Sequence, residues 1–141
     1  MMATRSPLKP EILNQAIAVA MSSQSKKKVG SIILKKTKLI ASAVNLETKT
    51  HPIQAAYGER ASCIHNNEGF RMKQYLHSEI LSIIRSKGRG DTIVVARVGG
   101  NGAKELRNSR PCAVCSIALR ESGIKHVHYS TDHGFLYEYW G

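Results

Sequence analysis

The alternation of apolar and polar positions along the chain predicts helices and strands of ordinary length. Apolar residues recur at helical spacing from Ile12 to Met21, which predicts an amphipathic helix. Two runs rich in β-branched residues, Val29 to Leu34 and Leu39 to Val44, are separated by four polar residues. This arrangement predicts an antiparallel hairpin.

In the second half of the chain, segments with helical spacing alternate with strand-like segments. It predicts helices for His77 to Ser86 and Pro111 to Ser122, and strands for Thr92 to Val98 and Lys125 to Ser130. A strand, helix and strand in succession imply a parallel pair with a crossover helix. The aromatic tail from Phe135 to Trp140 is interpreted as a last strand that returns as a hairpin.

Residues 47–75 are mostly polar and have weak periodicity, with Gln54 to Ile64 as the helical candidate. A connection this long is unusual in a compact domain unless it is functional or holds its own element. We therefore treat it as a candidate wall of a substrate pocket. The elements together predict one α/β domain over residues 1–141, a three-layer α-β-α architecture with a mixed five-stranded sheet.

The chain is strongly basic, with 21 Lys and Arg against 10 Asp and Glu and a formal net charge of +11. This excess favours anionic partners such as nucleotides or nucleic acid, although a basic surface that only aids solubility would also account for it. No run approaches 18 apolar residues, so no membrane span is expected. The absence of a signal-peptide pattern and the three scattered cysteines predict an intracellular, cytoplasmic protein.

Two short segments carry residues that bind metals. His77-Ser78-Glu79 opens one predicted helix, and Pro111-Cys112-Ala113-Val114-Cys115 opens another. Zn²⁺ accepts imidazole nitrogen and thiolate sulfur, and the two cysteines, three residues apart, share one helix face. The order and spacing match the zinc-deaminase signature H-x-E…P-C-x-x-C. We predict that His77, Cys112 and Cys115 hold Zn²⁺.

The carboxylate of Glu79 completes the predicted chemistry. Residues two apart in a regular helix point to opposite sides, so His77 and Glu79 can approach one metal only if His77 caps the helix. Three protein ligands leave a fourth position for water, which is typical of a catalytic site. Glu79 would take the water proton and deliver it to the substrate. The alternative is a structural zinc, with Cys63, His65 or His51 as the fourth ligand, and these three residues are also a candidate second metal site.

From about Val29 to Thr131 the chain resembles the cytidine and deoxycytidylate deaminase superfamily. The resemblance rests on the metal segments, on the hairpin ending at Asn45, and on the strand that follows Gly123. It implies a cytidine-deaminase-like fold, one zinc per subunit and frequent homo-oligomers. Asn45 falls where these enzymes place an Asn that contacts the substrate sugar. His77 as first ligand looks more like the dCMP, tRNA-adenosine and polynucleotide branches than the free-cytidine branch.

The chain departs from the family pattern beside both metal segments. Ser78 stands where the relatives usually have Ala, and Arg110 precedes the Pro-Cys motif where they commonly carry Thr or Ser with apolar residues. Arg110 either reaches a phosphate or is solvated. We count Asn45, Ser78, Arg110 and Pro111 as candidate substrate-binding residues.

Three functions remain open on the sequence alone. The first is deamination of a cytosine nucleotide, dCMP or CMP; the second is deamination of cytosine or adenine in single-stranded nucleic acid or tRNA. The third is a zinc-stabilised binding module without catalysis. Other residues have ordinary interpretations: His126 and His128 as strand residues, and the run from Lys26 to Lys28 as a solvated helix end that could also steer a phosphate.

Overall fold

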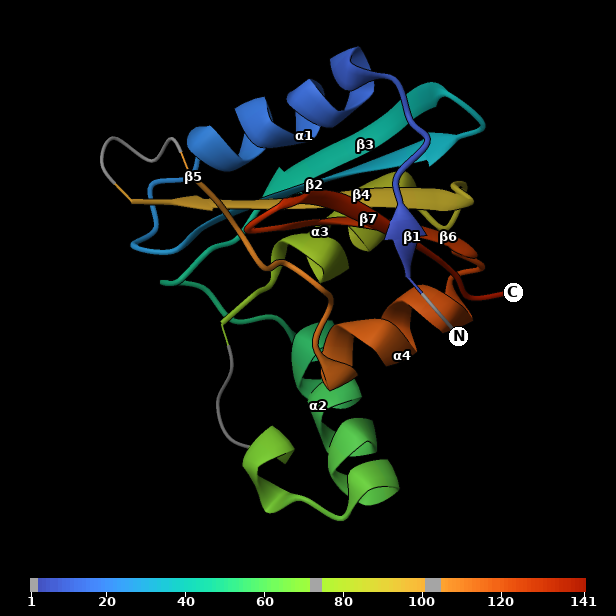
Figure 1. Ribbon diagram of the computed structural model, residues 1–141. Helices are drawn as coiled ribbons and strands as arrows, with labels where there is room; N and C mark the ends of the chain where they lie inside the picture. Colours follow the sequence, from blue (N-terminus) through green and yellow to red (C-terminus); the bar gives the residue numbers. More distant parts are fainter. Residues whose placement is uncertain (1–2, 72–74, 101–104) are drawn as a thin grey trace.

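A single sheet runs through the middle of the molecule, with helices on both faces (Figure 1). The computed structural model describes residues 3–71, 75–100 and 105–141. The strands follow the order β1-β7-β6-β4-β2-β3, and β5 pairs with β4 outside this path. Their bounds are β1 Thr4–Arg5, β2 Lys28–Lys35, β3 Lys38–Val44, β4 Thr92–Gly99, β5 Glu105–Arg107, β6 His126–Thr131 and β7 Gly134–Tyr139.

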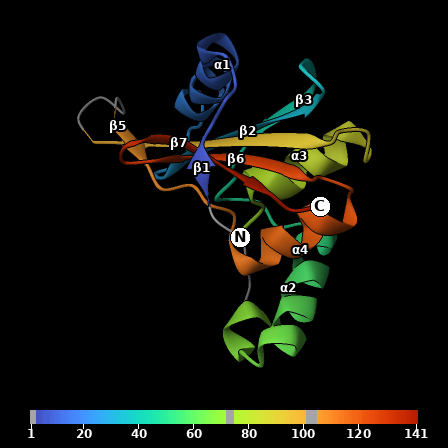
Figure 2. The same cartoon turned by 45° about the vertical axis from the view of Figure 1, so that its right-hand side comes forward.

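The helices complete the predicted three layers. Helix α1 lies on one face of the sheet, and α3 and α4 lie on the other, an arrangement that holds in both views (Figures 1 and 2). Helix α2 packs on α4 and lies farther from the sheet, followed by the short 3-10 helix η1 (Figure 1). The bounds are α1 Pro10–Met21, α2 Pro52–His65, η1 Glu68–Arg71, α3 Ser78–Ser86 and α4 Ala113–Glu121.

Strand pairing confirms the predicted hairpins and crossover. Strands β2 and β3 are antiparallel, as are β6 and β7, so the aromatic tail does return as a strand. Strands β4 and β6, joined through α4, are parallel, with Thr92 opposite His126 and Val95 opposite Tyr129. The sheet is therefore mixed, as expected.

The predicted count of five strands is too low by two, because the sheet has seven strands in the part of the chain that the structure describes. The additional strands are β1, which pairs with β7, and β5, which pairs with the far end of β4. They contain two and three residues. Segments this short hold hardly more than one period of alternation, whereas a strand pattern is recognised over about four to eight residues.

The core lies on both sides of the central strands β2 and β4. Ile32 and Ile33 point to opposite faces, and both are fully buried. Helix α1 packs so closely on β2 that a Cβ at Gly30 would lie 2.4 Å from the backbone nitrogen of Ala20. Glycine at position 30 therefore permits the close approach of helix and sheet, which buries Ala16 and Ala20 completely.

The long polar connection contains its own helix, as its length suggested. Helix α2 extends the predicted Gln54–Ile64 segment by two residues at its start and one at its end. Beyond β4, which ends at Gly99, Gly100 has φ 75°. Residues 101–104, like residues 72–74 of the long connection, lie outside the described residues.

Candidate metal centre and substrate cleft

The ends of α3 and α4 bring the two metal-binding segments together on one face of the sheet. His77 is the N-cap of α3 and has an extended backbone, with φ −77° and ψ 151°. Its N–H donates to the Oε1 atom of Gln54 in α2 at 3.1 Å. The predicted cap position is confirmed, and it allows His77 and Glu79 to face the same site although they are two residues apart.

Cys112 and Cys115 occupy the start of α4. Cys112 is the N-cap, with φ −70° and ψ 173°, so the helix begins at Ala113 rather than at the predicted Pro111. Its carbonyl still accepts the N–H of Ser116 at 2.8 Å, as a cap residue should. Cys115 is fully buried, whereas Cys112 opens into the cleft described below.

The spacing of the three ligand atoms fits Zn²⁺. The Nδ1 atom of His77 lies 3.2 Å from Sγ of Cys115 and 3.7 Å from Sγ of Cys112. Zn–N and Zn–S bonds of about 2.1 and 2.3 Å in a tetrahedron place nitrogen and sulfur about 3.6 Å apart. All three atoms lie within 4.8 Å of one another. The two observed separations bracket the tetrahedral value, so these residues can hold the ion with little movement.

The thiols are already unequal in their acidity. The pKa of Cys112 is lowered to about 4, first by the hydrogen bond from the Cys115 thiol and then by that from His77. The pKa of Cys115 is raised, because its thiol donates to Cys112 and is buried. Cys112 is therefore the more readily ionised thiol of the pair, and Zn²⁺ binding would release the proton of Cys115.

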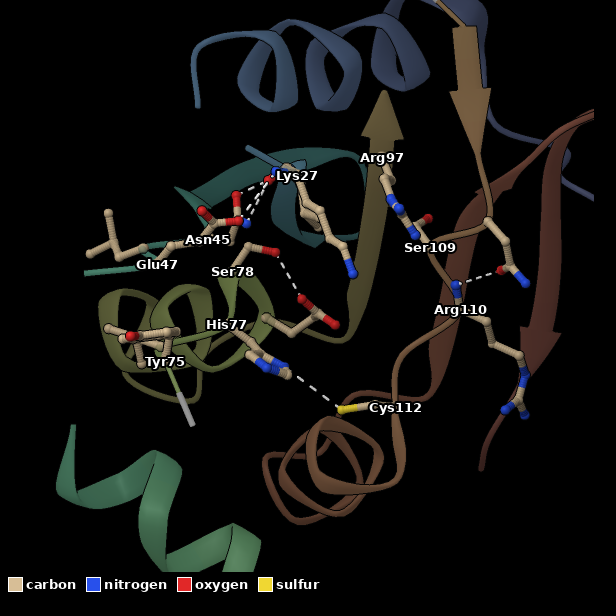
Figure 3. A pocket seen from close by; sticks show the side chains of 15 residues that line it. Lys27, Asn45, Glu47, Tyr75, His77, Ser78, Arg97, Ser109, Arg110 and Cys112 are labelled. Carbon is tan, nitrogen blue, oxygen red and sulfur yellow. Dashed lines mark hydrogen bonds between the residues drawn. The ribbon is translucent and has the colours of Figure 1, made fainter. Parts of the chain in front are cut away.

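Glu79 lies beside the three ligand residues. Its side chain is 6% exposed, and burial raises the pKa of the carboxyl group. The Ser78 hydroxyl donates to Oε1 of Glu79 at 2.8 Å (Figure 3). Ser78, which replaces the alanine usual in the family, therefore orients the carboxylate through a bond that alanine could not make. A carboxyl group with a raised pKa is suited to accept and return a proton near neutral pH.

A cleft of about 570 Å³ opens over these groups (Figure 3). This volume falls within the range of small-molecule sites. The wall combines the metal segments with β2, β4, the segment after β3 and the segment before α4. Its residues are Lys27, Val29, Asn45, Leu46, Glu47, Tyr75, Leu76, His77, Ser78, Glu79, Arg97, Asn108, Ser109, Arg110 and Cys112.

Asn45 lines the cleft, but its amide also holds the neighbouring loop. Its Oδ1 atom accepts from the Ser23 hydroxyl at 2.9 Å and from the N–H of Val29 at 3.1 Å. Its Nδ2 atom donates to the carbonyl of Lys27 at 2.7 Å. These three bonds fix the segment that carries Lys27. Glu47 and Tyr75, from the two ends of the long connection, also line the cleft.

Arg110 is paired inside the protein. Its guanidinium donates to both carboxylate oxygens of Glu138, at 2.8 and 3.0 Å. Figure 3 shows the side chain directed away from His77 and Cys112. Pro111, buried beside it, accepts a hydrogen bond from the Ser116 hydroxyl through its carbonyl. The paired guanidinium does not favour the phosphate contact considered from the sequence.

The other histidines and Cys63 do not assemble a second metal site. Within the described ranges, the one group with ligand atoms close enough for a metal is His77, Cys112 and Cys115. His51 caps α2 by accepting the N–H of Ile53 at 3.1 Å, and His65 packs edge-on against Phe70. These placements also give no support to a fourth protein ligand.

Two cations of the cleft had not been singled out as site residues from the sequence. Lys27 was considered only within the run from Lys26 to Lys28, a solvated helix end that could also steer a phosphate, and Arg97 lies in an otherwise apolar strand. The signal for Arg97 was the charge itself, because a fully buried central strand has no place for a guanidinium. The expected strand roles of His126 and His128 are confirmed, since both lie in β6.

His128 gives the fold a titratable contact far from the metal residues. Its Nδ1 atom is 2.8 Å from the Ser6 hydroxyl, and burial lowers the pKa of the imidazole from 6.5 to about 4. The unfolded chain therefore binds a proton more readily, so this contribution to stability is complete above pH 6.5 and is lost as the pH falls toward 4. Through His128, the parent should lose about 2–3 kcal/mol of its free energy of unfolding across this window, and His128→Gln should not show this loss.

Urea unfolding at pH 7.5, 6, 5 and 4 measures this effect. The difference in unfolding free energy between the parent and His128→Gln should shrink or reverse as the pH falls. Parallel pH profiles for the two proteins would contradict the assignment.

The sequence and its fold can now be compared with known proteins. Residues 8–131 match the family described as the cytidine and deoxycytidylate deaminase zinc-binding region. The match covers most of the chain, so this protein belongs to that family of zinc-binding deaminases. A search of curated proteins finds no match. None of the helices in the described ranges has the length and hydropathy needed to span a bilayer.

Solved structures with a similar fold include two bacterial proteins. One is RibD from Acinetobacter baumannii in its form 1, with 18% identity and a TM-score of 0.44 over 84% of this chain and 26% of that one. The other, from Thermotoga maritima, is a diaminohydroxyphosphoribosylaminopyrimidine deaminase/5-amino-6-(5-phosphoribosylamino)uracil reductase. It has 18% identity and a TM-score of 0.44 over 84% of this chain and 28% of that one. The chain spans about a quarter of the length of each.

Proposed function

We propose that this protein catalyses the hydrolytic deamination of a cytosine nucleotide, dCMP or CMP, to the uracil nucleotide and ammonia. The observation that carries the proposal is a cleft that lies over the metal residues and combines the buried carboxyl group of Glu79 with three side-chain cations, Lys27, Arg97 and Arg110. The family supplies the reaction type, and the cations and the volume of the cleft favour a small anionic substrate.

The residues of the cleft divide the work of the reaction. His77, Cys112 and Cys115 would hold Zn²⁺, which when bound lowers the pKa of water from 15.7 to about 7. Glu79 accepts the water proton as the water oxygen bonds to C4 of the cytosine ring. It passes this proton to the ring nitrogen N3. It then takes the remaining proton from the hydroxyl group on C4 and delivers it to the amino group, which leaves as ammonia when the C4–N4 bond breaks. The base thus gains one H₂O and loses one NH₃.

Ser78 and the surrounding burial prepare Glu79 for this exchange. The hydrogen bond from Ser78 fixes one carboxylate oxygen, which leaves the other oxygen free to face the substrate. Burial keeps the carboxyl pKa raised, so that the proton can be both accepted and returned. Exclusion of solvent strengthens each of these interactions.

A substrate panel on zinc-loaded protein tests the proposal. It contains cytidine, deoxycytidine, CMP, dCMP, adenine and guanine nucleosides, and single-stranded DNA and RNA, with ammonia release and product mass as readouts. We expect turnover of dCMP or CMP, with the oligonucleotides inert. Turnover of oligonucleotides alone would replace this proposal with a polymer deaminase, for which the net charge of +11 offers an electrostatic basis. No turnover at all with zinc bound would support a binding module.

A further inference from the structure

The charged residues of the cleft differ in what they already bind. Of its three cations, Arg110 is neutralised by Glu138. Among the described residues, no hydrogen bond or ion pair engages the ammonium group of Lys27 or the guanidinium of Arg97. Both side chains point into the cleft in Figure 3. Two unpaired cations in one cavity favour an anionic ligand.

The carboxylates of the same cleft are engaged elsewhere. Glu47 accepts the backbone N–H groups of Lys26 and Lys27 at 3.1 and 3.2 Å. Glu79 is bonded to Ser78. Among the described residues neither carboxylate forms an ion pair with Lys27 or Arg97. The backbone N–H groups of Lys27 and Lys26 lower the pKa of Glu47, and the charges of these lysines add to that effect. Arg97 is thus the cation of the subsite whose charge is most clearly left for a ligand.

The backbone at both cations is held firmly. Lys27 is fixed through its carbonyl by Asn45 and through its N–H by Glu47, as described above. The N–H of Arg97 donates to the Ser130 hydroxyl at 2.9 Å. A ligand that bridges the two side chains would pay little for ordering the main chain that carries them.

The position of Arg97 in the sheet is electrostatically unfavourable in the absence of an anionic ligand. Arg97 lies directly opposite Arg107 in the antiparallel pair of β4 and β5. Like charges in such a pair destabilise a sheet. Arg107 has its own partner, because its guanidinium donates to Glu105 at 2.6 Å. Arg97 is the unpaired member of this pair among the described residues.

We infer that Lys27 and Arg97 form an anion subsite that binds the phosphate monoester of the substrate, so that the enzyme prefers a nucleoside monophosphate to the free nucleoside. The inference rests on the proposed function for the nature of the rest of the ligand. Arginine offers a planar fork that matches two phosphate oxygens, and lysine offers a point charge for the third. The subsite lies within the same cleft as His77 and Glu79, and one mononucleotide would occupy both.

Binding without turnover gives the sharpest test. The background is zinc-loaded Glu79→Gln protein, and isothermal titration calorimetry measures the affinities of dCMP and deoxycytidine. We expect dCMP to bind at least about tenfold more tightly. Lys27→Gln and Arg97→Gln should each remove most of this ratio while the affinity for deoxycytidine stays nearly constant. Arg97→Lys should retain part of it.

A matched control is Lys38→Gln, which removes an exposed cation that does not line the cleft. It should leave the dCMP to deoxycytidine ratio unchanged. Thermal melts establish that each variant is folded. A ratio that survives in both Lys27→Gln and Arg97→Gln, or that falls equally in Lys38→Gln, overturns the subsite.

Ribose 5-phosphate separates this inference from the proposed function, because it carries the phosphate without a base. Its binding should depend on Lys27 and Arg97 whichever base is deaminated. Such binding without deamination of any cytosine compound would leave the subsite standing and refute the proposed reaction. Deamination of dCMP and deoxycytidine with equal kcat/KM in the parent would refute the subsite and leave the reaction. If Lys27 and Arg97 affected the binding of oligonucleotides but not that of dCMP or ribose 5-phosphate, the two cations would contact a polymer backbone rather than a phosphate monoester.

Discussion

Replacement of Glu79 with glutamine should abolish most deaminase activity and leave the zinc in place. The amide is nearly isosteric and can still accept the hydrogen bond from Ser78, so the fold should be retained. It cannot take up and return a proton, and positioned acid–base groups contribute about 10²–10⁴-fold to rates. We expect kcat to fall by about this factor, while metal analysis still finds one zinc per chain because His77, Cys112 and Cys115 are unchanged.

Glu121→Gln is the matched control, because Glu121 is an exposed carboxylate that pairs with Arg60 and does not line the cleft. Its kcat should stay close to that of the parent. If Glu79→Gln kept full activity, or if both variants lost activity to the same extent, Glu79 would not be the proton carrier. Loss of zinc from Glu79→Gln would instead assign the residue a role in assembling the metal centre.

The largest expected loss of stability comes from Glu138→Ala. Glu138 is 6% exposed and accepts four hydrogen bonds: two from Arg110, one from the Tyr129 hydroxyl at 2.6 Å and one from the Trp140 indole at 3.1 Å. These donors lower the pKa of its carboxyl group to about 2, with Arg110 as the largest cause. Truncation leaves the buried hydroxyl and indole donors without an acceptor.

We expect Glu138→Ala to lower the free energy of unfolding by about 2–4 kcal/mol, as for a buried polar network that loses its centre. The Arg110 side chain is 50% exposed, so solvent screens part of its pairing, and the two buried donors account for much of the loss. The control is Glu105→Ala, which breaks the exposed pair with Arg107 and should cost at most about 1 kcal/mol. Chemical denaturation measures both, and equal losses would contradict the central role of Glu138.

The metal residues could be predicted from the sequence because their geometry is local. A separation of three residues places Cys112 and Cys115 on one side of a helix start, and the need to share a metal with Glu79 placed His77 at a cap. The main strands were predictable for the same reason, because β2 and β4 have continuous apolar runs. Within each metal segment and each strand the pattern is short, whereas the signature H-x-E…P-C-x-x-C indicated that His77 meets the two cysteines, which follow it by 35 and 38 residues.

Features that depend on distant pairing were not predictable. Arg110 and Glu138 are 28 residues apart, and no local pattern indicates that they meet. The same holds for β5, whose three residues become a strand only because β4 extends beyond its parallel partner. Arg97 acquires its place in the cleft from that extension, so its role could emerge only from the fold.

The two halves of β4 have different neighbours, and this division has a consequence for how the protein can change. Residues 92–95 pair with β6 inside the core, whereas residues 97–99 pair only with β2 and β5. Ser109, bonded to Val95 and Ser130, clamps the chain back onto the sheet before it reaches Cys112. Ser109 separates Cys112 from the antiparallel pair formed by β5 and residues 97–99 of β4. This pair can therefore vary in length or charge without disturbing the metal ligands. Under the proposed function, the residues that would select the substrate are separated from the groups that would carry out the reaction, so a new specificity could arise around Arg97 while Glu79 and the metal ligands are inherited unchanged.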